Sequence, residues 1–204
     1  MNITSVRDFN PQWLHYRLSM NPEYKLRFMD RAYKHLTKGG LLSAVLAPLP
    51  YESRQAEIDY AIIAESARWG DAKRRPSFTK QDWLTFLESL YTRFFPDRTD
   101  IVIQQLKDEG LYPTLKTPLL RLNGTLTYTE YKRFSGEQMV SLTHPDNATG
   151  GSLYYTLDNT DPRNLGGGVN LTAKSAQGSV SLTLDQTSVI NARTYDNGTW
   201  GPLK

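Results

Sequence analysis

The chain has 204 residues, of which 39% are hydrophobic and 11% aromatic, enough apolar material for one large core or two small ones and too much for a disordered protein. Its 24 basic and 21 acidic residues leave a net charge of +3, which excludes the strongly basic field typical of duplex nucleic-acid binding. The absence of cysteine excludes disulfides, thiolate metal sites and cysteine nucleophiles.

Short segments bear on the remaining partner classes. The basic cluster Lys73-Arg74-Arg75 suits either a phosphate or anionic-glycan contact or a solvated linker, and we favour the linker because nucleic-acid signals are longer. No run of about eighteen apolar residues is present, and the N-terminus lacks a basic region followed by an apolar one. We expect no nucleic-acid partner, no membrane insertion and no targeting signal within this chain.

The chain up to residue 112 has the pattern of helices. Asn10-Pro11 and Asn21-Pro22 each place an N-cap residue before a proline at the first helical position, where no N–H is needed. A helix over about 22–38 should end at Gly39-Gly40, and a further helix over 53–69 should end at Gly70.

The next predicted helix has the best-defined start, at Thr79. Asp82 follows three residues later in a variant of the capping box, while Phe78 and Trp83 occupy the two hydrophobic-staple positions. We expect this helix to end at Pro96, since proline cannot continue the hydrogen-bond ladder of a helix.

The helical half closes with a helix over about 98–109, and two prolines at 113–118 mark a linker.

From Leu119 onward the hydrophobic period changes to two, which predicts short strands with one buried and one wet face each. The last strand alternates in the same way, with Ile190, Ala192 and Thr194 on one face and Val189, Asn191 and Arg193 on the other.

These patterns predict an α+β protein of two domains. Residues 1–112 would form an N-terminal helical bundle, and residues 113–204 a C-terminal antiparallel β-sandwich of the immunoglobulin-like type. A turn should follow the strand 152–157, because the segment 158–162 is rich in short polar residues and ends in proline.

Four segments of the second half match a known type of module: residues 153–163, 179–184, 188–193 and 197–200. In these segments the second half resembles the chitobiase/β-hexosaminidase C-terminal type of immunoglobulin-like domain. Asn159 stands where that family would have glycine, and asparagine also tolerates a positive φ. The resemblance implies a non-catalytic module.

Four segments of the helical half, residues 13–18, 28–35, 64–71 and 110–113, carry a second resemblance. In these segments the helical half resembles the C-terminal part of the CotH-like (spore coat protein H) kinase domain, which occurs in large bacterial proteins. We find no match here for the ATP-holding lysine or the catalytic and metal-binding aspartates of such kinases. It implies a non-catalytic accessory segment of a longer surface or secreted protein, located outside the cell, whose partners are neighbouring domains.

The sequence offers no cofactor motif. Its three histidines lack paired ligand spacing, and Gly166-Gly-Gly168 lacks the lysine of a phosphate loop. Asp158 and Asp161 could serve glycoside hydrolysis, but in a solvated turn no fixed partner would tune either carboxyl group. Turn formation is our interpretation, and a calcium site formed by Asp158, Asn159 and Asp161 is the alternative.

A polar cluster in the helical half is a further candidate for function. Glu65, Arg68, Trp69 and Asp71 form the densest polar cluster of the helical half, either a remnant of a kinase-like wall or, as we favour, an ion-pair network between helices.

The aromatic residues of the second half support a different hypothesis, binding of a polysaccharide. The faces of sugar rings are apolar and stack on aromatic side chains, and the candidates are Tyr154, Tyr195 and Trp200. An ATP-dependent phosphotransferase is the third hypothesis. Taken together, we expect the chain by itself not to be an enzyme.

Overall fold

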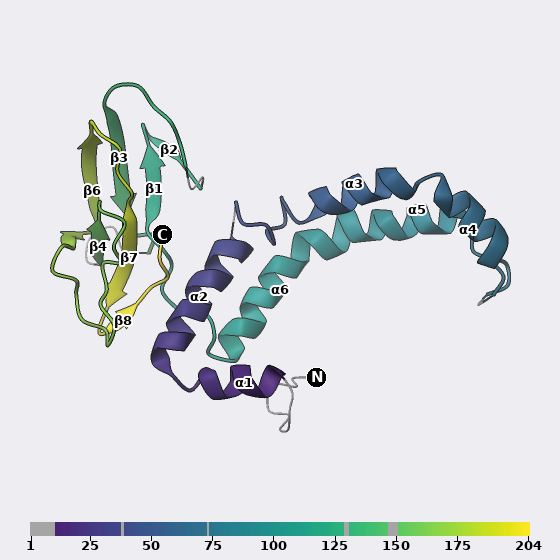
Figure 1. Cartoon of the computed structure of the whole chain (residues 1–204), viewed down its shortest axis with the longest axis horizontal. Coiled ribbons are helices and arrows are strands. Elements are labelled where there is room, and N and C mark those ends of the chain that lie inside the picture. Colours follow the sequence, from purple (N-terminus) through teal and green to yellow (C-terminus); the bar gives the residue numbers. More distant parts are fainter. Residues whose placement is uncertain (1–10, 38, 73, 129–130, 147–150) are drawn as a thin grey trace. The chain divides into compact units, whose positions relative to one another are not determined.

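The structure is a computed structural model that describes residues 11–37, 39–72, 74–128, 131–146 and 151–204. It combines α-helices with antiparallel sheets, as expected for an α+β protein (Figure 1). The chain divides into two compact units, one containing residues up to 33 together with 106–204 and the other residues 34–105. The first unit therefore combines part of the helical half with the strands, whereas the sequence suggested a boundary at 113–118.

The strands of the first unit form two four-stranded antiparallel sheets (Figure 1). One sheet has the order β2-β1-β3-β6 and the other β5-β4-β7-β8. The strands are β1 (Leu119–Leu122), β2 (Thr125–Leu126), β3 (Gln138–Thr143), β4 (Ser152–Thr156), β5 (Lys174–Gln177), β6 (Ser179–Leu184), β7 (Asn191–Asp196) and β8 (Thr199–Trp200).

Both sheets contribute to one hydrophobic core. Leu142 of β3, Leu153 and Tyr155 of β4, and Ala192 of β7 are buried together, with partly buried aliphatic side chains packed around them. The predicted alternation is confirmed in β3. In β4, Leu153 and Tyr155 are buried as expected, but Thr156, on the predicted wet face, is buried as well. The predicted turn at Asn159 is confirmed as well, with φ at +66°.

The prediction that every strand has one wet face is wrong for β7. Arg193, on its expected outer face, is only 1% exposed. The guanidinium donates to Asp30 of the helix α2 (Pro22–Leu36) at 2.7 and 2.9 Å and to Asp161 at 2.6 and 2.8 Å, and it also reaches the carbonyl oxygen of Gly201 at 2.9 Å. We call Asp30, Asp161 and Arg193 the Arg193 cluster.

Two acidic residues attach α2 to the β-sheets. Glu23 accepts from Arg163 at 2.7 and 2.8 Å and from the backbone N–H of Gly166 at 2.8 Å. Asp30, about two helical turns further on and hence on the same face of α2, also accepts from the backbone N–H of Leu203 at 2.9 Å. The same face of one helix therefore carries both attachments.

The helix start predicted at Asn21-Pro22 is confirmed. The helix α1 is described from Pro11 to Leu18, and its predicted N-cap residue, Asn10, lies outside the described residues. For α2, the Asn21 side chain accepts from the backbone N–H of Glu23 at 2.9 Å, as an N-cap residue should. Past the end of α2, Gly39 has φ at +93°, the conformation expected where a glycine closes a helix.

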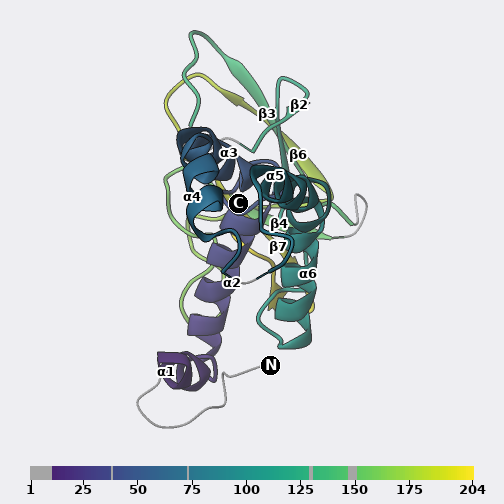
Figure 2. The ribbon, with the colours of Figure 1, turned by 90° about the vertical axis from the view of Figure 1, so that its right-hand side faces the viewer.

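The second unit contains the end of α2, then α3 (Pro48–Ile58), α4 (Ala61–Trp69), α5 (Lys80–Ser89), the π-helical turn η1 (Leu90–Phe94) and most of α6 (Phe95–Asp108). Figures 1 and 2 show α4 beside the start of α5. The single helix predicted over 53–69 is instead two, α3 and α4, separated by a turn at Asp59 and Tyr60, and α3 already begins at Pro48.

The predicted helix end at Pro96 is also wrong. The wider turn η1 leads directly into α6, in which Pro96 is the second residue. The backbone N–H of Phe95 donates to the carbonyl oxygen of Leu90, five residues earlier, so the helix widens to the π-helical spacing immediately before Pro96, which has no N–H to donate. A π-helical turn before the proline therefore lets two helices follow one another without a loop.

Removing the central guanidinium should destabilise the first unit strongly. Arg193→Met keeps most of the side-chain volume but leaves Asp30 and Asp161 facing each other, which we expect to lower the free energy of unfolding by about 3 kcal/mol. The matched control is Arg54→Met, because Arg54 pairs with Glu57 on the surface and should contribute less than about 1 kcal/mol. Urea unfolding followed by circular dichroism measures both, and equal losses would contradict the assigned role.

The ion pair of Glu23 should make stability depend on acid pH. The hydrogen bond from Arg163 lowers the pKa of Glu23 from 4.5 to about 2. A carboxyl group with a lowered folded-state pKa contributes stability that is complete above its unfolded pKa and lost as the pH falls through the folded one. The stability difference between wild type and Glu23→Gln should therefore shrink between pH 4.5 and about 2. A difference that stays constant over this range, measured by urea unfolding, would count against the pair.

Candidate functional site

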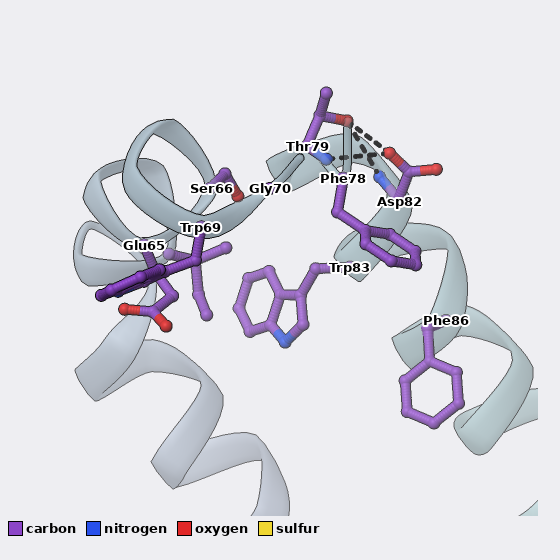
Figure 3. Close-up of a pocket in the computed structure, with 10 residues that line it drawn as sticks. Glu65, Ser66, Trp69, Gly70, Phe78, Thr79, Asp82, Trp83 and Phe86 are labelled. Atoms are coloured by element: carbon purple, nitrogen blue, oxygen red, sulfur yellow. Dashed lines mark hydrogen bonds between the residues drawn. The ribbon is translucent and has the colours of Figure 1, made fainter. Parts of the chain in front are cut away.

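The second unit has a hollow of about 420 Å³ between α4 and α5, which we call the aromatic groove (Figure 3). Both helices and the segment between them contribute aromatic side chains to its wall. The lining residues are Ile62, Glu65, Ser66, Trp69, Gly70, Phe78, Thr79, Asp82, Trp83 and Phe86. In Figure 3 the indole of Trp83 lies in the middle, with Trp69 and Glu65 on one side and Phe86 on the other.

Local sequence signals build the two sides of the groove. The predicted capping box is confirmed: the Thr79 side chain accepts from the backbone N–H of Asp82, whose carboxylate accepts from the backbone N–H of Thr79 at 2.9 Å. Gly70 closes α4, and a Cβ there would lie 2.4 Å from the carbonyl oxygens of Ser66 and Phe78. Only glycine lets the chain return this closely and present Phe78 beside Trp83.

Charged groups at the groove are partly neutralised. Arg74 donates to Asp82 at 2.6 Å, and this bond, with those from Thr79, lowers the pKa of Asp82 to about 2. Arg68 and Arg74 also stack on aromatic rings, with their guanidinium carbons 5.0 Å from the centre of Trp69 and 4.2 Å from that of Phe78.

The predicted polar cluster is divided by the structure. Glu65 and Trp69 line the groove and Arg68 stacks on Trp69, but Asp71 is not among the lining residues. Within the described part of the chain, none of the ion pairs joins Glu65, Arg68 or Asp71 to another residue. The cluster thus contributes to a wall of an open groove, whereas we expected an ion-pair network.

The three predicted sugar-stacking aromatics do lie together. The ring centres of Tyr154, Tyr195 and Trp200 are 4.7 to 5.7 Å apart in pairs. Trp200 is only 7% exposed, and its indole N–H donates to the carbonyl oxygen of Gly167 at 2.8 Å. Its ring faces are therefore occupied by protein, while Tyr154 and Tyr195 remain half-buried. As placed, the three rings pack against one another and offer no broad exposed platform.

The predicted calcium residues have other partners. Asp158 accepts from the backbone and side chain of Thr160 at 3.0 and 2.5 Å, and these bonds lower the pKa of Asp158. Asp161 binds the guanidinium of Arg193, so our expectation that it lacks a fixed partner is corrected. A cation here would compete with that guanidinium. In the described residues, no group of three or more His, Cys, Asp or Glu side chains is arranged to hold a metal ion.

Sequence reasoning missed two contributors that depend on neighbouring elements. Phe86 lies one helical turn after Trp83, a spacing that could have placed it on the same side of α5. The sequence of β7 alone does not indicate that Arg193 is buried and paired. Glu23 and Asp30, two acids on one face of α2, were the available hint that a basic partner would cover that face.

No protein-family model, curated protein or solved structure matches this chain. The resemblances to a CotH-like domain and to a chitobiase-type module therefore stay predictions. Of the described helices, none is both long and apolar enough to cross a membrane.

Proposed function

We propose that this chain is a non-catalytic accessory segment of a larger bacterial surface or secreted protein. In this proposal the two antiparallel sheets form an immunoglobulin-like sandwich that spaces or docks neighbouring domains. Support comes from the resemblance of short segments to such proteins, namely residues 13–18, 28–35, 64–71 and 110–113 of the helical half and 153–163, 179–184, 188–193 and 197–200 of the second half.

The observation that carries the proposal is that the most buried charged residues bind one another within the protein. Buried, closely paired titratable groups are where catalytic residues are usually sought. Burial alone would lower the pKa of Arg193, but the hydrogen bonds to Asp161 and Asp30 outweigh it and raise this pKa. Every nitrogen of that guanidinium thus donates to protein, and the two terminal nitrogens of the Arg163 guanidinium donate to Glu23. These ion pairs attach the helix α2 to the strand-containing part of the first unit.

The size of the native polypeptide tests the accessory role. An antibody against residues 1–204, used on cell and medium fractions of the source organism, should detect a band far above 23.2 kDa. A band at 23.2 kDa would overturn the proposal that the segment belongs to a larger protein.

Nucleotide binding tests the absence of phosphoryl transfer. Calorimetric titration of the folded chain with millimolar ATP and Mg²⁺ should give no saturable heat, because no residues matching the ATP-holding lysine and catalytic aspartate were found. Circular dichroism in the same buffer serves as the folding control. Saturable ATP binding together with transfer of the γ-phosphate to any acceptor would contradict the proposal and favour the phosphotransferase.

A further inference from the structure

The aromatic groove exposes an unusual amount of apolar surface for a helical unit. Trp69 is 55% exposed, Phe78 44% and Phe86 57%. Among the described residues of this unit, Leu36 and Leu87 are the buried hydrophobic side chains. Contiguous exposed aromatic surface of this kind usually marks a binding site. The volume of about 420 Å³ falls in the range of small-molecule sites.

Several polar groups of the groove have no partner in the part of the chain that the structure describes. They are the carboxylate of Glu65, the hydroxyl of Ser66 and the indole N–H groups of Trp69 and Trp83. Asp82 differs, since its oxygens bind Arg74 and Thr79. The groove therefore combines aromatic faces with acceptors and donors that are free to bind a ligand.

The balance of charge selects the class of ligand. Two guanidinium groups, those of Arg68 and Arg74, already stack on the rings, and a cationic ligand would be repelled by both. An anion would face the carboxylates of Glu65 and Asp82. These four charges sum to zero, so the groove favours an uncharged ligand.

The free polar groups then separate two uncharged classes. An apolar helix lying in the groove would cover Glu65 and the indole N–H groups without giving them hydrogen-bond partners, because its own backbone groups are already bonded within the helix, and leaving these groups without partners is costly. A sugar ring has apolar faces that stack on aromatic rings and hydroxyls that both donate and accept. It satisfies both requirements of the groove.

We propose that the aromatic groove between α4 and α5 binds a neutral hexopyranose chain. The sugar rings stack on Trp69 and Trp83, and a hydroxyl donates to the carboxylate of Glu65. This site is distinct from the aromatic side chains of the β-sheets and goes beyond the accessory role proposed above.

The test is a binding screen of the whole chain against cellohexaose, chitohexaose, xylohexaose and maltohexaose, by calorimetry and tryptophan fluorescence. At least one should bind saturably. Trp69→Ala removes a stacking face and should weaken that binding on the order of tenfold, or about 1.4 kcal/mol. Glu65→Gln should weaken it on the order of threefold, or about 0.6 kcal/mol.

Tyr60→Ala is the matched control, because Tyr60 is an 85% exposed aromatic residue just before α4 that does not line the groove. Its binding should stay within about twofold of wild type. A fourth variant, Tyr154→Ala, removes an aromatic side chain of the β-sheets. Wild type and all four variants should have the same circular dichroism spectrum. Failure of every saccharide to bind overturns the proposal, and so does binding that Tyr154→Ala abolishes while Trp69→Ala leaves it intact. Neither result bears on ATP binding or polypeptide size, so the accessory role is judged separately.

Discussion

The buried guanidinium of Arg193 is the interaction on which the first unit depends. A charge at 1% exposure is tolerated only when it is fully paired, and Asp30 and Asp161 pair it from two directions. Asp30 belongs to α2 and Asp161 to the turn after β4, so one side chain of β7 joins a helix, a turn and a sheet. The Glu23–Arg163 pair repeats this connection at the other end of the same helix face.

The two units differ in how they use their polar and apolar groups. In the first, charged side chains that could have acted on a ligand are bound within the protein. In the second, aromatic side chains and a free carboxylate remain accessible around one groove. A structural role for the first unit and a binding role for the second are therefore compatible within one accessory segment.

Much of the local structure could be predicted because its causes are local. Alternation placed Leu142 and Leu153 in the core, and the capping box placed the start of α5. Arg193 could not be placed in this way, since a period of two indicates which face a residue occupies but not which helix covers that face. The helix end predicted at Pro96 was wrong for a related reason, because whether a proline ends one helix or begins the next depends on the turn before it.

The candidate site was predictable only in part, because Glu65 and Trp69 lie in one helix while Phe86 comes from another.

A double-mutant cycle of Asp30→Ala and Arg193→Met measures whether the Arg193 cluster holds α2 to the β-sheets. The free energies of unfolding of wild type, both single variants and the double variant give the coupling between the two side chains. We expect a coupling of at least about 1.5 kcal/mol, and effects that add within about 0.5 kcal/mol would show that the cluster does not have this role.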